Sequence, residues 1–166
     1  GGVTVNAGTL LIDNNAAFGT GAVTINGGGI GSVGNRSPTN AMTWAGNFSV
    51  EGAGQLTSSG AITMTGGGRT VAVNAGSFTV NGAIADGGGG LGLTKTGPGV
   101  LVLGGANTYT GPTNVSAGVL AVSGNQSAAT GLITVESTAA LAGLGTTGGG
   151  LTFNSGSGIV FGQTGL

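Results

Sequence analysis

Val5-Asn6-Ala7-Gly8-Thr9-Leu10-Leu11-Ile12 is a pattern that the chain uses three times. It returns as Val73-Asn74-Ala75-Gly76-Ser77-Phe78-Thr79-Val80 and as Val115-Ser116-Ala117-Gly118-Val119-Leu120-Ala121-Val122. Each copy holds the end of one strand pattern, a three-residue corner that closes with glycine, and the start of a new strand. The first and third copies also match further along without a gap, so that residues 22–25 fall on residues 132–135. A corner that recurs in this way indicates a repeat protein of the solenoid type.

Short runs that alternate apolar and polar residues occur along the whole chain. Their period of two and their many β-branched residues predict strands with one buried face. Gly-rich or Asn-Gly turns separate the runs, as at residues 26–29, 51–54 and 81–82, and leave no stretch long enough for an amphipathic helix. We therefore expect an all-β fold with essentially no α-helix. The runs are 3–5, 23–25, 48–50, 62–64, 71–73, 78–80, 101–103, 133–135 and 151–153.

In a solenoid, each strand pairs with its equivalent in the next coil, and the inward side chains stack into one continuous core. A one-residue slip would turn the apolar side chains outward, so the alternation itself holds the register. The apolar positions are therefore expected to form the core rather than a ligand pocket. A β-sandwich is the alternative fold that strands of this length also allow.

Glycine accounts for 41 of the 166 residues, several times its usual share of about 7%. Such a chain folds only if the glycines occupy tight turns where other residues would clash. Disordered chains usually combine low hydrophobicity with high net charge, whereas this chain is 39% hydrophobic and 4% charged, with a net charge of −1. The composition therefore favours an ordered protein.

The composition also excludes several kinds of partner. The few charged side chains are scattered, and a nucleic acid needs several cations in one footprint, so we expect no nucleic-acid binding. The chain has no cysteine and no histidine, which removes disulfides and the usual ligands of transition metals, and we expect neither a metal nor a cofactor. No apolar run approaches the roughly 18 residues of a membrane span, so we expect no direct membrane insertion by this segment.

A second pattern runs through residues 93–120, where the same kinds of residue recur at nearly every second position. It resembles the autotransporter-associated β-strand repeat, also called the passenger-associated transport repeat, which occurs in large bacterial surface proteins. Residues 1–12 look like the second half of another copy, and residues 69–95 resemble the strands that commonly precede the repeat. The positions that carry the resemblance are Leu93, Lys95, Gly97, Gly99, Leu101, Leu103, Gly105, Asn107, Tyr109, Gly111, Thr113, Val115, Gly118 and Leu120.

This resemblance implies a right-handed parallel β-helix that is exported across the outer membrane, with the repeat helping the passenger to fold during secretion. We expect residues 1–166 to be a single β-helical segment, an excerpt of a longer protein that is secreted or lies on the surface of a Gram-negative-type bacterium. The expected role is that of a non-catalytic passenger or stalk segment for surface display or adhesion. Its expected partners are neighbouring β-helical repeats of the same protein, with surface glycans or matrix as further candidates.

Two other functions stay open. A self-assembling extracellular filament or sheath would use the unpaired strand edges at the two ends of the helix for end-to-end association. A polysaccharide-binding or polysaccharide-cleaving β-helix would need paired carboxylates, and the candidates are Asp13, Glu51, Asp86 and Glu136. Because the chain has few cations and aromatic residues, and no histidine for a serine triad, we expect no enzyme.

Six further features are candidate sites, and each has a simpler structural interpretation. Residues 29–34 have the letters of a dinucleotide fingerprint, but no helix is expected to follow, so a loop is predicted. Residues 87–90 are similar to calcium-binding repeats, but only Asp86 accompanies them. Lys95 is predicted at a solvent-facing strand position, without a catalytic role. Trp44 and Tyr109 are interpreted as packing at coil edges, and Asn107 as a turn or ladder residue.

One repeated surface feature remains. Hydroxyl residues stand between inward apolar residues in several strands and are predicted to point outward, where they would form a hydroxyl-lined face. Regular threonine arrays can bind ice or glycans, but threonine is also a strong strand former that keeps a surface polar without charge, and the second interpretation is favoured. The residues are Thr4, Thr24, Ser49, Thr63, Thr79, Thr134 and Thr152.

Overall fold

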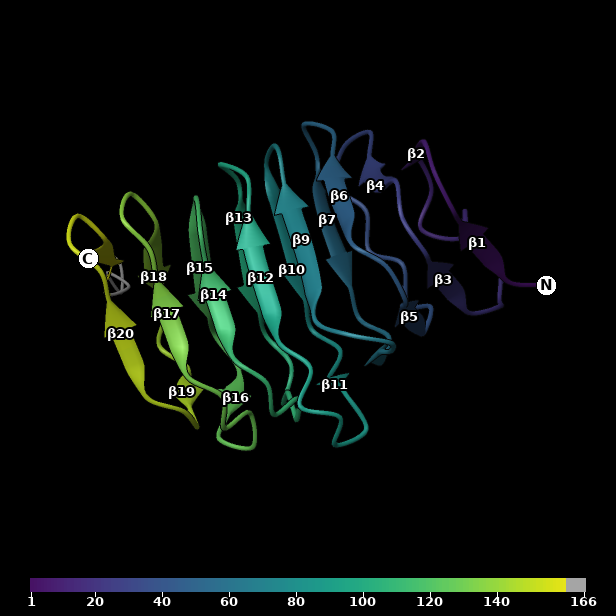
Figure 1. Ribbon diagram of the computed structural model, residues 1–166. Helices are drawn as coiled ribbons and strands as arrows, with labels where there is room; N and C mark the ends of the chain where they lie inside the picture. The colour runs from purple at the N-terminus through teal and green to yellow at the C-terminus, as the bar shows by residue number, and fades with distance from the viewer. Residues whose placement is uncertain (161–166) are drawn as a thin grey trace.

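The computed structural model describes residues 1–160, and these form one continuous stack of parallel strands wound around a common axis (Figure 1). Every strand pairing among these residues is parallel. They contain no helix, and therefore no helix that could cross a membrane. In Figure 1 the near strands run upwards, the chain returns behind them, and the coils progress from right to left. This path makes the superhelix right-handed, so the predicted right-handed parallel β-helix is confirmed, and the β-sandwich is not the fold.

Three sheets form the walls of the helix, and sheet B extends along its full length. Sheet B contains one strand in each of eight coils, and the coils are numbered here by these strands. In chain order they are β2 (Thr9–Ile12), β4 (Gly29–Ser32), β6 (Phe48–Glu51), β9 (Arg69–Val73), β12 (Leu93–Thr96), β14 (Thr113–Val115), β17 (Ile133–Val135) and β20 (Leu151–Phe153).

The other two sheets each cover part of the length. Sheet A lines the N-terminal coils and consists of β1 (Val3–Val5), β3 (Val23–Ile25), β5 (Met42–Trp44), β8 (Ile62–Met64) and β11 (Ile84–Ala85). Sheet C begins in the third coil and consists of β7 (Gln55–Ser58), β10 (Ser77–Val80), β13 (Val100–Leu103), β15 (Val119–Val122), β18 (Ala140–Ala142) and β21 (Gly158–Val160). A short pair, β16 (Asn125–Gln126) with β19 (Thr146–Thr147), completes the structure.

The coils differ in length while the register of the strands stays regular. A residue's partner in the next coil lies 18 positions further along for Ile133 and Leu151, but 24 for Arg69 and Leu93. The connecting segments absorb this difference. Because each strand buries alternate residues, the inward positions of successive coils form continuous rows along the axis.

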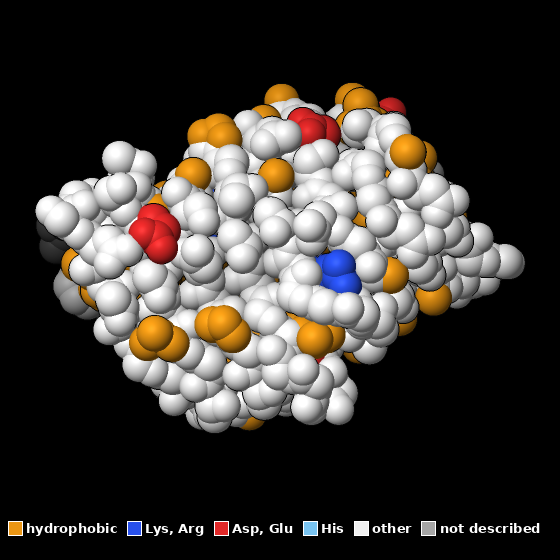
Figure 2. Space-filling model, viewed as in Figure 1, with side chains coloured by type: hydrophobic (Ala, Val, Ile, Leu, Met, Phe, Trp, Pro, Cys, Tyr) orange, Lys and Arg blue, Asp and Glu red, His pale blue; other side chains and the backbone are white. Residues whose placement is uncertain are grey.

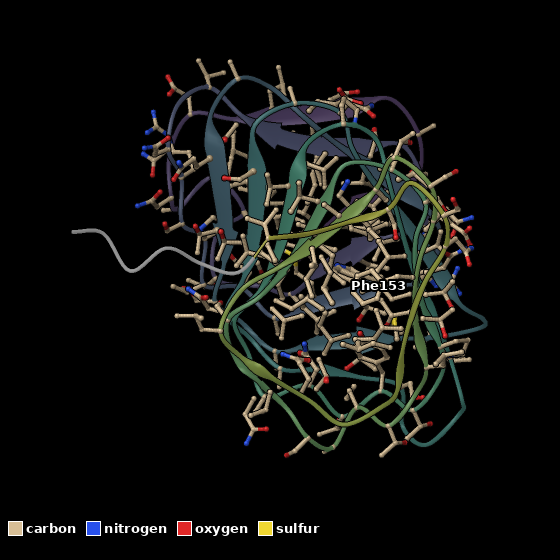
Figure 3. All side chains as sticks on the ribbon, turned by 90° about the vertical axis from the view of Figure 1, so that its left-hand side faces the viewer. Phe153 is labelled. Atoms are coloured by element: carbon tan, nitrogen blue, oxygen red, sulfur yellow. The ribbon has the colours of Figure 1, made fainter. Side chains whose placement is uncertain are left out.

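These rows are the hydrophobic core. In sheet C one inward row consists of leucines and one phenylalanine: Leu56, Phe78, Leu101, Leu120 and Leu141. In sheet B the corresponding row is Phe48, Val71, Lys95, Val115, Val135 and Phe153, and Figure 3 shows Phe153 at its C-terminal end, inside the ring of strands. The predicted core position of the apolar residues is thus observed, with one charged side chain among them.

The nine predicted strands are all present, but one predicted loop is a strand. Residues 29–32, within the fingerprint-like stretch, form β4 and are fully buried in the wall. A side chain on Gly31 would lie 2.1 Å from the carbonyl oxygen of Glu51, so glycine is needed there for close packing between coils rather than for a phosphate loop.

The three copies of the repeated corner do not lie on the same edge of the helix. The first copy joins sheet A to sheet B through β1 and β2, whereas the copies at residues 73–80 and 115–122 join sheet B to sheet C. Likewise, residues 22–25 lead into sheet A through β3, while their sequence equivalents 132–135 lead into sheet B through β17. The same short sequence therefore makes the same bend at two different edges.

Candidate functional site

The family-like repeat at residues 93–120 spans the fifth and sixth coils, from β12 to β15. All of its non-glycine signature residues are buried, and between residues 99 and 111 every second residue is buried. The regular spacing of the signature is thus the inward face of the coil. The repeat also holds three of the eight buried polar residues of the described part of the chain, Lys95, Asn107 and Thr113, and Gln126 follows it closely.

Lys95 is not at a solvent-facing position, and that prediction is wrong. Its side chain points into the core with no exposed surface, on the same face of β12 as Leu93. The ammonium Nζ donates hydrogen bonds to the carbonyl oxygens of Thr96 and Gly97, both at 2.8 Å, and of Ala117 at 3.1 Å. Desolvation by burial lowers the pKa of Lys95 to about 8. Its spacing of two residues from Leu93 was the sequence signal for an inward position.

The carbonyl oxygens around Lys95 come from two successive corners. Thr96 ends β12 and Gly97 begins the turn after it, and Ala117 belongs to the turn after β14 in the next coil. Gly97 and Gly118 have φ of +77° and +68° at these corners, a conformation that favours glycine. A side chain on Gly118 would also lie 2.4 Å from the carbonyl oxygen of Gly97. The two corners are therefore stacked closely, with the lysine beneath them.

Asn107 lies in a ladder of buried amides, one of the two positions predicted for it. Its Oδ1 accepts a hydrogen bond from the backbone N–H of Ile84 at 2.7 Å, and its Nδ2 donates to Oε1 of Gln126 at 2.6 Å. Gln126 in turn donates from Nε2 to the carbonyl oxygen of Gly105 at 2.8 Å. The ladder satisfies buried polar groups of three successive coils where regular strand pairing stops.

Tyr109 and Trp44 lie in the core, so their interpretation as coil-edge packing is corrected. Tyr109 shares a hydrogen bond of 2.8 Å between its hydroxyl and that of Thr113, and burial raises its pKa. Trp44 is fully buried and packs edge-on against Phe48, with ring centroids 5.1 Å apart, and beside Phe78 at 6.3 Å. Neither ring is available as a platform for a sugar.

Asp86 anchors the glycine-rich loop at residues 87–90 to the next coil. One carboxylate oxygen accepts a hydrogen bond from the N–H of Gly88, and the other accepts from Leu91 N–H and from both the N–H and hydroxyl of Thr110, all within 3.0 Å. These hydrogen bonds, that of Thr110 N–H above all, lower its pKa to about 2 against the opposing effect of burial. Because the carboxylate faces N–H donors, the arrangement does not resemble a calcium site.

The four acidic residues do not come together. Asp13, Glu51, Asp86 and Glu136 belong to the first, third, fifth and seventh coils, so successive carboxylates are two coils, or about 9.5 Å, apart along the axis. The charged side chains visible in Figure 2 are accordingly few and scattered. Among residues 1–160 there is also no group of three acidic residues that could hold a metal ion. Asp13 pairs with Arg36, Glu51 with Asn74, and Glu136 with Asn154.

The outward hydroxyl residues form rows on separate sheets rather than one face. On sheet A the row is Thr4, Thr24, Thr43 and Thr63, in direct register. On sheet B it is Thr70, Thr94, Asn114, Thr134 and Thr152. Thr79 lies on sheet C beside Thr57, and Ser49 lies on sheet B beside Ala72. The predicted outward orientation is observed, whereas a single hydroxyl-lined face is not.

Together these observations define the class of protein: a parallel β-helix whose fifth and sixth coils are joined by buried polar contacts over a repeated corner. Comparison with known families agrees, because residues 93–122 match the family model of the passenger-associated transport repeat. The predicted resemblance to this family is confirmed, with the match two residues longer than the predicted 93–120. The half copy predicted at residues 1–12 stays a prediction.

A curated relative points in the same direction. Over 74 residues, or 45% of its length, the chain is 46% identical to the adhesin BmaC autotransporter of Brucella suis biovar 1 (strain 1330). The matched stretch covers 2% of that protein. A comparison with solved structures finds no match. The chain therefore carries a passenger-associated transport repeat and is similar to an autotransporter adhesin.

Proposed function

We propose that this chain is a non-catalytic passenger segment of a secreted or cell-surface autotransporter-like protein, and that it serves as a rigid spacer for surface display or adhesion. The observation that carries the proposal is the match of residues 93–122 to the passenger-associated transport repeat, together with the similarity to an autotransporter adhesin. Both resemblances also support a Gram-negative-type bacterium as the source. Supporting folding during export is the specific task proposed for the repeat.

The geometry of the repeat supports this task. Lys95, Asn107 and Asp86 each make hydrogen bonds to a neighbouring coil, so the fifth and sixth coils are tied together by more than apolar packing. In a solenoid, stability is a sum of terms within coils and between neighbouring coils, so strong contacts at one junction favour nucleation there. Such a nucleus would let the remaining coils add in sequence as the chain emerges from the membrane.

A display assay tests the proposal. The chain would be placed between the signal peptide and the membrane barrel of an established autotransporter in a Gram-negative host, and the surface fraction measured by protease accessibility. We expect the native chain to be displayed and Gly118→Val to reduce display several-fold, because a side chain there meets a carbonyl oxygen of the coil before it. Ala117→Gly, at the same corner, is the matched control. Equal display of Gly118→Val, or no display of the native chain, would contradict the proposal.

For adhesion, the surface that we propose is the outward hydroxyl row of sheet B, with neutral surface glycans as its partner. The row is polar and regularly spaced, and few charges surround it, which suits uncharged sugars better than acidic ones. Binding of the purified chain to a glycan array would be compared with that of a Thr94→Val and Thr134→Val double variant. Loss of glycan binding in the variant is expected. Unchanged binding would mean that the adhesive surface is not the hydroxyl row of sheet B.

A further inference from the structure

Lys95 places a charged group in a row that is otherwise apolar. Its neighbours in the row are Val71 in the coil before and Val115 in the coil after, followed by Val135. An apolar side chain would fit this environment, and burying a charge is unfavourable unless its hydrogen bonds are satisfied. The lysine must therefore contribute something that a valine or leucine in the row would not.

The apolar alternation cannot by itself determine the register between the fifth and sixth coils. A one-residue slip turns the apolar side chains outward, but a two-residue slip returns them to the inward face. The connecting segments differ enough in length to absorb two residues, since coil lengths range from 18 to 24. A two-residue slip would thus keep the inward side chains inward, at little cost in apolar contact.

The three carbonyl oxygens around Lys95 distinguish the two registers. Those of Thr96 and Gly97 belong to the lysine's own corner and would follow it in any register. That of Ala117 belongs to the next coil, and pairing Lys95 with Thr113 instead of Val115 would move it by about 7 Å along the strand. The hydrogen bond would then be lost, and the ammonium would stay buried without its third acceptor.

We propose that Lys95 sets the register between the fifth and sixth coils, with its ammonium acting as a buried latch onto the Ala117 carbonyl of the following corner. Single buried polar residues have this role in coiled coils, where they fix register at some cost in stability. The latch concerns the folding of this segment alone. It does not depend on the proposed surface display, and either can fail without the other.

Engineered disulfides test the proposal directly, because the chain has no cysteine of its own. Thr94→Cys with Asn114→Cys reports the native register, in which these two outward residues are paired. Thr96→Cys with Asn114→Cys reports the two-residue slip, since a disulfide forms only when the Cα atoms are within about 7 Å. Both pairs are oxidised in a glutathione buffer, with Lys95 intact and with Lys95→Met. We expect the ratio of slipped to native disulfide to rise at least tenfold in Lys95→Met.

Two controls make the outcome decisive. Leu101→Met alters a buried apolar residue in the same coil and should leave the disulfide ratio unchanged. Lys95→Gln keeps an N–H donor without the charge and should give an intermediate ratio, and it decides the question if Lys95→Met does not fold. A ratio in Lys95→Met, or failing that in Lys95→Gln, no higher than in Leu101→Met would overturn the proposal.

Discussion

Replacing Lys95 by methionine is expected to remove a rise in stability that the native chain shows at alkaline pH. Burial lowers the pKa of Lys95 from 10.5 to about 8 in the folded protein, so between these values the unfolded chain binds more protons than the folded one. The free energy of unfolding must then increase with pH across this window, because the cost of burying the charge disappears as the folded amine loses its proton. The full cost is present only well below pH 8.

The size of the effect follows from the shift. Between pH 7.5 and 9.5 the linkage from this shift gives roughly 1 to 2 kcal/mol. The window should stop near pH 9.5, because burial raises the pKa of Tyr109 and ionisation of the unfolded tyrosine favours unfolding at higher pH. Methionine has no proton to lose, so the free energy of unfolding of Lys95→Met should not change with pH over the same range.

Urea unfolding at several pH values measures this difference. Trp44 is the single tryptophan of the chain and is fully buried, so its fluorescence reports loss of the core. The native chain should gain stability from pH 7.5 to 9.5, while Lys95→Met should not. Leu101→Met serves as the control, and its stability should rise with pH like that of the native chain. A flat native profile, or an equal rise in Lys95→Met, would refute the buried-ammonium explanation.

Three further substitutions test the corners and the loop anchor. Thr138 has φ of 71°, so Thr138→Gly should raise the free energy of unfolding by about 0.5–1 kcal/mol, whereas Thr134→Gly, within β17, should lower it. Gly118→Ala should lower the free energy of unfolding, measured by chemical denaturation, by at least about 2 kcal/mol. The reason is that Gly118 has a φ of +68° and that the new methyl carbon would lie 2.4 Å from a carbonyl oxygen. An effect no larger than that of Ala117→Gly would contradict this. Asp86 has a lowered pKa, so the stability that its hydrogen bonds provide should be lost as the pH falls from 4 towards 2. An acid titration of Asp86→Asn should lack this loss of stability. An identical loss in the variant would refute the assignment of the acid transition to Asp86.

The sequence was informative about everything that depends on a residue and its near neighbours. The alternation of apolar residues predicted all nine runs as strands, and the glycine at the end of each repeated corner predicted a bend, because local sterics decide both. The signature at residues 93–120 likewise predicted the family resemblance that the match at residues 93–122 confirms. The alternation also indicated an inward position for Lys95. The prediction followed instead the general preference of lysine for water, and it was wrong.

What the sequence could not provide is the pairing between coils. Residues in contact across coils are 18 to 24 positions apart, and that distance varies from coil to coil, so no fixed period identifies the partners. The contacts of Asp86 with Thr110 and of Asn107 with Gln126 depend on this pairing. So does the placement of the first repeated corner on a different edge of the helix from its two copies. Local sterics and alternation thus determine the strands, the bends and the buried face from sequence alone, whereas the stacking of whole coils decides which side chains meet.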